Sequence, residues 1–161
     1  MKALKNRELS EEQCKHSGEQ SSPVRTKTKK EIDNMKVMIM DHQKNFAVKV
    51  VEINENNTLH EMYRLLHCDI VEHASFYVDG MEYDLWFDEE FLLKPGPYMA
   101  TFLLGECKPG NCQIVCGSWM ISRSDEQGCT IGLTKNDIKK LRQYIDINRM
   151  LLYRAIEKKY Y

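Results

Sequence analysis

Several features that would identify a familiar class of protein are missing from this chain of 161 residues. No stretch approaches the ~18 consecutive apolar residues that a membrane-spanning helix needs. The first 20 residues are too polar to contain the apolar run of a secretory signal peptide, so we expect a cytoplasmic protein. In that compartment the six cysteines are expected to stay reduced.

Catalytic signatures are missing as well. The sequence contains neither a P-loop nor a GxGxxG motif, and its histidines fit neither an HExxH helix nor a facial triad. It has no nucleophile elbow for Ser/His/Asp chemistry and no EF-hand loop. Enzymatic activity therefore has no positive support, and no cofactor is indicated.

A zinc site is the one metal centre that the cysteine spacing leaves open. The cysteines concerned lie close together in the second half of the chain: Cys107, Cys112 and Cys116. Structural zinc sites usually combine two tight Cys-x2–4-Cys pairs, and no second pair occurs here. We therefore favour small buried apolar residues over zinc ligands.

Charge is distributed unevenly along the chain, although the formal net charge is only −1. Residues 1–34 carry a net charge of +2, residues 35–133 carry −8 and residues 134–161 carry +5. The acidic central segment argues against broad nucleic-acid binding, because phosphate backbones attract basic surfaces.

These three segments also differ in composition. Residues 1–34 are poor in large apolar side chains and cannot offset the entropy of ordering, which indicates a flexible N-terminal arm. Residues 35–133 begin abruptly with an apolar run and are predicted to form a compact domain. Residues 134–161 have apolar side chains at helical spacing, which predicts a C-terminal amphipathic helix.

The central segment alternates strand-forming runs with turn residues. We predict strands over Lys36–Met40, Phe46–Ile53, Ile70–Val78, Met81–Phe87 and Gln113–Ser122. Asp79-Gly80 is a strong two-residue hairpin signal, because both positions tolerate positive φ. Because side chains alternate between strand faces, the strand after this turn has one apolar face, formed by Tyr83, Leu85 and Phe87. Its other face carries Glu82, Asp84 and Trp86.

Capping signals indicate two helices. Thr58 and Glu61 have the spacing of a capping box, which predicts a short helix beginning at Thr58. Thr134 and Asp137 give a weaker signal of the same kind for a long helix that runs to about Lys159. A break of this helix near Asp146 is left open. Together these elements predict an α+β fold with a mostly antiparallel sheet, one short helix and a long C-terminal helix.

Two groups of charged residues are candidate contact surfaces. The first is an acidic corner with a tryptophan that we expect to be exposed: Asp84, Trp86, Asp88, Glu89 and Glu90. A solvated strand end is the simpler explanation of these carboxylates, and a negative patch that recognises a basic partner is the alternative. The second is the basic side of the terminal helix: Lys139, Lys140, Arg154 and Lys158. This side is either the solvated face of a core-packed helix or a contact for phosphate or an acidic protein.

The order of these motifs resembles a small family of unknown-function proteins encoded by phages, plasmids and conjugative elements of Gram-positive bacteria. The resemblance rests on Ile70-Val71-Glu72, Asp88-Glu89-Glu90, Gly117, the turn from Asp125 to Gly128, and the helix start from Leu133 to Ile138. It covers about residues 35–142 and departs after Glu90. It implies a setting in a bacterial host, and the family has no activity to carry over.

We therefore expect a non-enzymatic binding protein of a phage or mobile genetic element. It would block a host component, through contact between the acidic corner and a host protein with a basic surface. The alternative is a module that binds or sequesters a nucleotide, in a pocket where the terminal helix meets the sheet. A homodimer through the C-terminal helix is a further expectation, and a membrane partner is not indicated.

Overall fold

The computed structural model describes residues 33–95, 99–105 and 112–160, except the side chains of residues 112 and 158–160. Its elements follow in the order β1 (Asn34–Met40), β2 (Val48–Asn54), the 3-10 helix η1 (Glu55–Asn57), α2 (Thr58–Leu66), β3 (Val71–Val78), β4 (Met81–Asp88), β5 (Ala100–Gly105), β6 (Cys112–Cys116), β7 (Trp119–Ser124), β8 (Thr130–Ile131) and α3 (Lys135–Tyr160). The predicted α+β class is confirmed. Residues 1–32 of the predicted arm lie outside the described residues.

A six-stranded antiparallel sheet forms the centre of the fold. Its strand order is β2-β1-β7-β4-β3, and the short strand β8 pairs with the end of β7. Strands β5 and β6 form a separate two-stranded sheet. The predicted hairpin at Asp79-Gly80 is confirmed, because both residues have positive φ (50° and 77°) and β3 pairs with β4 directly across them.

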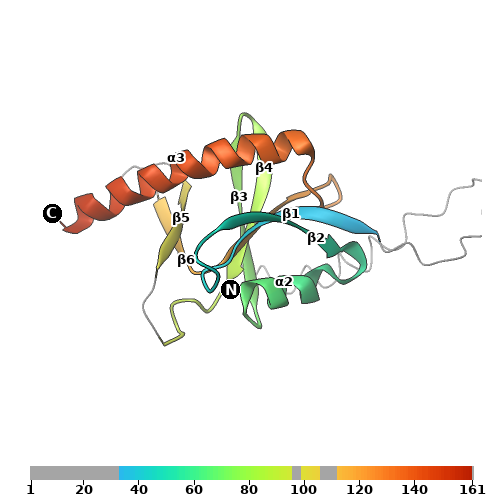
Figure 1. The fold of residues 1–161 in the computed structure, drawn as a ribbon, viewed down its shortest axis with the longest axis horizontal. Helices are drawn as coiled ribbons and strands as arrows, with labels where there is room; N and C mark the ends of the chain where they lie inside the picture. Colours follow the sequence, from blue (N-terminus) through green and yellow to red (C-terminus); the bar gives the residue numbers. More distant parts are fainter. Residues whose placement is uncertain (1–32, 96–98, 106–111, 161) are drawn as a thin grey trace, which may run out of the picture.

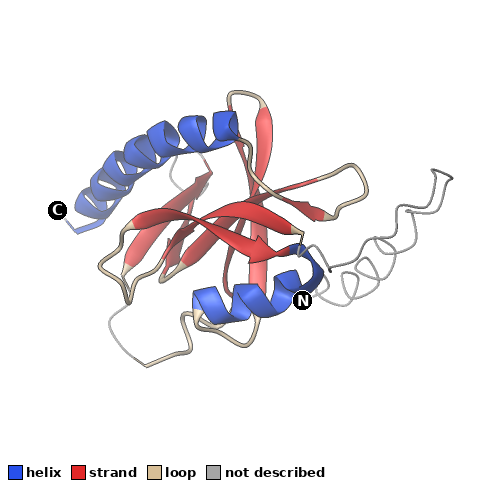
Figure 2. Ribbon diagram, turned by 45° about the vertical axis from the view of Figure 1, so that its right-hand side comes forward, coloured by secondary structure: helices blue, strands red, loops and turns tan. Residues whose placement is uncertain are grey.

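The two helices lie on opposite faces of the central sheet (Figures 1 and 2). α2 covers one face and packs on a cluster that includes Val37, Met62, Trp86 and Met120. On the other face lie α3 and the β5–β6 pair (Figure 1), whose core includes Leu85, Phe102, Trp119, Leu141 and Ile145. Alternate residues of β1, β4 and β7 therefore enter different cores.

Two sets of polar contacts hold α3 in place. The predicted cap at its start is confirmed: the Asp137 carboxylate accepts the Thr134 N–H at 2.8 Å, and the Asp137 N–H donates to Thr134 Oγ1 at 3.2 Å. Tyr83 of β4 donates its hydroxyl to the same carboxylate at 2.8 Å. Further along, the buried Asn148 amide bonds both backbone groups of Leu103. α3 is therefore attached to β4 and to β5.

The predicted capping box of the first helix is wrong. Thr58 has helical backbone angles and donates its hydroxyl to the Glu55 carbonyl, and Glu61 pairs with Arg64 at 2.6 Å. The reason is that η1 runs directly into α2 and is itself capped by the Asn54 side chain. α2 therefore begins at Thr58 as predicted, but Thr58 directly follows η1 and does not cap the helix.

The single strand predicted over Gln113–Ser122 is two strands in different sheets. Gly117 has φ of +82° and separates β6 from β7, and Thr101 Oγ1 donates to its carbonyl at 2.7 Å. A residue in this left-handed conformation ends one strand direction and starts another. The chain therefore changes sheet completely at Gly117.

The structure also decides two smaller points. α3 runs through Asp146 without the break that the sequence left open. Cys68 and Cys116 are free thiols, whereas Cys129 is disulfide-bonded and not reduced as expected. Which thiols come within bonding distance depends on the tertiary arrangement, and the sequence alone carries no signal for it.

Candidate binding site

A polar recess lies on the part of the sheet that α2 leaves uncovered. α2 is only nine residues long, so its apolar contacts reach β4 at Trp86 and go no further. Beyond Trp86, residues of β3, β4 and β7 surround a cavity of about 190 Å³. We call this cavity the carboxylate recess, and it is lined by His73, Ser75, Glu82, Asp84, Ser124, Asp125 and Gly128. None of these lining residues carries a permanent positive charge.

Asp84 lies at the centre of the recess and is 4% exposed. Its carboxylate accepts the Ser75 hydroxyl at 3.4 Å and, on its other oxygen, the Ser124 hydroxyl. His73 Nε2 lies 4.0 Å from the same carboxylate. Ser75 is directly opposite Asp84 in the β3–β4 register, while Ser124 comes from β7. Strands β3 and β7, on either side of β4, therefore both direct polar side chains toward one buried carboxylate.

Trp86 lies beside His73 of the recess and is buried. Its side chain is 6% exposed, so the expectation of an exposed contact residue is wrong. The indole packs on His73 with ring centroids 5.1 Å apart and donates Nε1–H to Ser122 Oγ at 2.8 Å. The physical reason is that α2 packs against this face of β4, which a strand-by-strand analysis could not foresee.

The accessible carboxylates of the recess lie at its rim. Glu82 is exposed, and its negative charge beside the phenol of Tyr77 raises the pKa of that tyrosine. Asp125 is half-buried and accepts the backbone N–H groups of Gln127 and Cys129, at 3.0 and 2.8 Å. A ligand entering the recess would therefore meet two rim carboxylates before it reached Asp84.

The acidic corner predicted from the sequence does not form one surface. Asp88 is 8% exposed, accepts the Glu90 N–H at 2.9 Å and pairs with Lys94 at 2.5 Å. Only Glu89 is exposed, and Glu90 is half-buried. Asp84 and Asp88 share a strand face but are separated by four residues, which is about 13 Å along a strand. Asp84 thus belongs to the recess and Asp88 to a separate ion pair.

The predicted basic residues of α3 do not converge on the recess. Lys139 and Arg154 are exposed, and Lys140 is half-buried with Nζ 3.9 Å from Asp79. The side chain of Lys158 lies outside the described part of the chain. The same helix exposes four large apolar or aromatic side chains: Ile147, Met150, Leu151 and Tyr153. Dimerisation through α3 stays a prediction.

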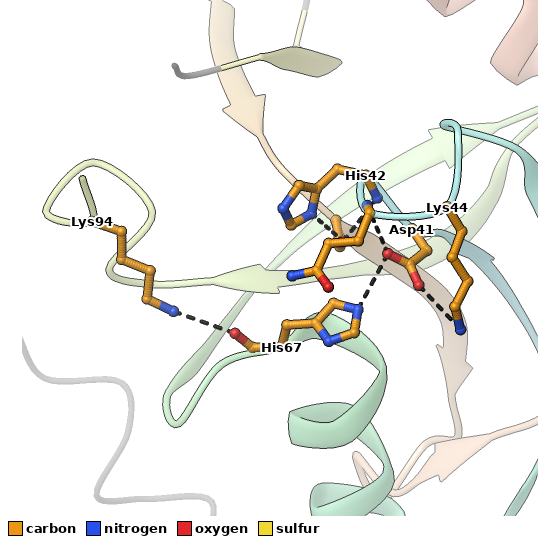
Figure 3. A network of polar contacts seen from close by, with 7 residues as sticks. Asp41, His42, Lys44, His67 and Lys94 are labelled. Atoms are coloured by element: carbon orange, nitrogen blue, oxygen red, sulfur yellow. Dashed lines mark hydrogen bonds and ion pairs between the residues drawn. The ribbon is translucent and has the colours of Figure 1, made fainter. Parts of the chain in front are cut away.

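A second polar cluster joins the turn after β1 to the end of α2 (Figure 3). Asp41 accepts a bond from His67 Nε2 at 3.2 Å and lies 3.5 Å from Lys44 Nζ. Next to it, His42 Nδ1 is 2.7 Å from the Ser118 hydroxyl. The two imidazoles meet edge to face with centroids 6.2 Å apart. This cluster links three segments that are distant in sequence.

The second cluster contains the residue types of nucleophilic catalysis, but its serine is not accessible to a substrate. Ser118 is 3% exposed, and its oxygen also accepts the His42 N–H at 3.1 Å, so a substrate cannot reach it without rearrangement. Burial opposes ionisation of Asp41, but hydrogen bonds from the Gln43 N–H and from His67 outweigh it and lower the pKa of the carboxyl. We interpret the cluster as a structural connection between β1, α2 and β7.

Of the residues that line the recess, only Asp84 was a candidate from the sequence, and six others were missed: His73, Ser75, Glu82, Ser124, Asp125 and Gly128. A signal existed for the first two, because a two-residue turn at Asp79-Gly80 fixes which residues of β3 lie opposite Asp84 and Trp86. No comparable signal exists for Ser124 and Asp125, because β7 reaches β4 only through the tertiary fold.

Metal ligands do not gather in the described ranges: no group of three or more His, Cys, Asp or Glu side chains there could hold a metal ion. Of the cysteines considered for zinc, Cys116 is a half-buried free thiol. Cys107 and the side chain of Cys112 lie outside what the structure describes. The expectation that these cysteines are not zinc ligands therefore stays a prediction.

Comparison with known proteins gives one match, to a domain of unknown function (DUF3846) over residues 35–146. Because this match covers more than half of the chain, the protein belongs to the DUF3846 family. No curated protein and no solved structure matches the chain. Within the described residues, no helix combines the length and apolarity needed to cross a bilayer.

Proposed function

We propose that this DUF3846 protein is a non-enzymatic binding protein of a phage or mobile genetic element that blocks a host component. We assign its contact surface to the carboxylate recess in place of the acidic corner. The partner is a host protein with a basic surface, from which an Arg or Lys side chain enters the recess. The mobile-element setting is inferred from the sequence resemblance described above.

One observation carries the proposal. The recess combines an uncovered part of a sheet face with three carboxylates, those of Glu82, Asp84 and Asp125, and has no Lys or Arg in its lining. Guanidinium and ammonium groups form their strongest hydrogen bonds with ionised carboxylates. The hydroxyls of Ser75 and Ser124 hold the Asp84 carboxylate in place before a partner arrives. A pre-positioned acceptor lowers the entropy cost of binding.

The net charge of the whole domain also favours binding of a basic partner. Residues 35–133 carry a net charge of −8, which attracts a basic partner over several ångströms and speeds encounter. Salt screens this attraction, because the Debye length is only about 8 Å at physiological ionic strength. Partner binding should therefore weaken as salt rises.

The test compares two pairs of substitutions that remove the same amount of charge. Glu82→Gln with Asp125→Asn neutralises the rim of the recess, and Glu89→Gln with Glu90→Gln neutralises the acidic corner. Binding of a fluorescent Arg-rich peptide is measured by anisotropy at low and at physiological salt. Loss of a rim carboxylate pair should weaken binding about tenfold, and the corner pair should change it less than about twofold.

The same variants then serve as bait in a bacterial lysate. A stoichiometric, salt-sensitive partner that is retained by the corner variant and lost by the rim variant would identify the host component. Equal peptide affinity of wild type and rim variant would refute the recess as the contact surface. Equal weakening by both variants would show that only overall charge matters.

A further inference from the structure

A second cavity lies on the opposite side of the sheet, between α3 and the start of β2. It has a volume of about 210 Å³ and is lined by Val48, Arg142, Ile145, Asp146 and Arg149. Ile145 is 3% exposed, and Val48 packs against the same core, so both give the cavity an apolar floor. We call it the arginine groove. Its position matches the place where the sequence suggested a nucleotide pocket, although none of its basic residues was singled out.

Helical geometry explains why the polar lining residues share one side. Arg142, Asp146 and Arg149 are four and three residues apart, so their side chains project from the same flank of α3. The adjacent flank carries Leu141, Ile145 and Asn148, which are buried and fix the rotation of the helix. Core packing of α3 therefore places both arginines beside the start of β2.

The two arginines differ in how firmly they are held. Arg149 Nη2 donates to the Phe46 carbonyl at 3.1 Å. This carbonyl belongs to the turn before β2, where Asn45 and Phe46 both have positive φ (61° and 55°). A guanidinium has five N–H donors, so a single bond to Phe46 leaves Arg149 able to bind a ligand. Arg142 is exposed and has no ion-pair partner within the described ranges.

We propose that the arginine groove binds the phosphate group of a small phosphate monoester, such as a nucleoside monophosphate. Two guanidiniums over an apolar floor suit a phosphate, because its oxygens can accept from both forks at once. The cavity of about 210 Å³ is smaller than the roughly 300–1,000 Å³ of sites that enclose a whole drug-sized ligand. The phosphate and its nearest carbon atoms fit inside, and the rest of the ligand extends out of the groove.

Tyr153 is placed to contact the extending part. It follows Arg149 by four residues, so it lies one helical turn further along the same flank. Its side chain is 73% exposed, which leaves the ring accessible. An exposed ring beside a phosphate site can stack on a base, and such stacking strengthens binding because every base has a π-face. A nucleotide should therefore bind more tightly than inorganic phosphate.

Substitution of Asp146 should change the ligand affinity in a direction that distinguishes an anion site from a cation site. Its carboxylate lines the same groove between the two arginines and repels an anionic ligand. Replacing Asp146 by Asn should therefore raise the affinity for a phosphate ester. An adventitious cation site in the groove would respond in the opposite way. This inference is independent of the carboxylate recess, which lies on the other face of the sheet.

The experiment is calorimetric titration of the full chain with adenosine monophosphate, inorganic phosphate and adenosine at low salt. We expect the nucleotide to bind, phosphate to bind more weakly and adenosine not to bind. Arg142→Gln should weaken nucleotide binding about tenfold or more, the loss expected for one charge-assisted contact. Asp146→Asn should strengthen it several-fold. Arg142 is exposed, so its substitution should not disturb folding.

Two controls separate the groove from general basicity and from the recess. Arg154→Gln removes the same charge from the same helix outside the groove, and it should change affinity less than about twofold. Glu82→Gln with Asp125→Asn should leave nucleotide binding unchanged. Binding of phosphate and nucleotide with equal affinity would confirm the anion site and refute the contact with Tyr153. Absence of binding by either anion, or equal weakening by Arg142→Gln and Arg154→Gln, would overturn the proposal.

Discussion

Asn148 offers the sharpest test of how α3 is attached to the rest of the protein. This residue is 3% exposed and lies in the middle of the helix. Its amide nitrogen donates to the Leu103 carbonyl at 2.7 Å, and its oxygen accepts the Leu103 N–H at 3.0 Å. Leu103 is 1% exposed and belongs to β5, so these backbone groups are out of reach of solvent. The Asn148 side chain thus makes the two hydrogen bonds to Leu103 that a neighbouring strand would otherwise make.

Substitution of Asn148 by Ala should destabilise the fold substantially. It leaves one buried N–H and one buried C=O without partners, and each unsatisfied group costs about 1–3 kcal/mol. The expected loss in free energy of unfolding is therefore about 3 kcal/mol. This is a large part of the roughly 5–15 kcal/mol that stabilises a typical domain. It corresponds to a lower melting temperature by on the order of 10 °C.

Urea denaturation of wild type and variant measures this loss directly. The midpoint should fall while the dependence of unfolding free energy on urea stays constant, because the same surface is exposed on unfolding. Asn136→Ala is the matched control, since Asn136 is exposed in the first turn of the same helix and should change stability by less than about 0.5 kcal/mol. A loss below about 1 kcal/mol for Asn148→Ala would show that water or a shifted strand satisfies Leu103.

Two further predictions concern the same core. Burial and the bond to Asp137 raise the pKa of Tyr83 from 10.0 to about 12. The resulting stabilisation is complete below pH 10 and is lost as the pH rises through about 12, so the difference in melting temperature between wild type and Tyr83→Phe should shrink across this range. A constant difference would contradict the raised pKa. Gly132→Ala should destabilise the fold by more than about 1 kcal/mol, because the added Cβ would lie 2.9 Å from Met35 Cβ and 3.0 Å from the Lys36 nitrogen. Gly128→Ala, where a Cβ meets nothing within 4 Å, measures the separate cost of positive φ, and a loss below about 0.5 kcal/mol for Gly132→Ala in urea denaturation would refute the steric explanation.

Local signals account for most of the correct predictions. The turn at Asp79-Gly80 and the cap formed by Thr134 and Asp137 depend on residues within three positions of each other. The apolar face of β4 follows from alternation along one strand. The capping box at Thr58 failed for a local reason too, because η1 extends the helical segment upstream.

The candidate sites were only partly predictable. Asp84 was singled out and does line the recess, but the recess exists because α2 stops short of it. Trp86 was expected on the surface, and α2 buries it. Arg142 and Arg149 of the arginine groove were overlooked, because a sequence does not show which flank of a helix meets another element.

By itself the sequence determined the fold class, the turn at Asp79-Gly80, the start of α3, and the first four strands with the short helix between them. These depend on backbone preferences and on contacts between near neighbours, which any short segment carries within it. The tertiary structure alone decided the change of sheet at Gly117, the separation of Asp84 from Asp88, and the meeting of α3 with β2. Each of these depends on how far one element extends over another, and that distance is set only when the whole core packs.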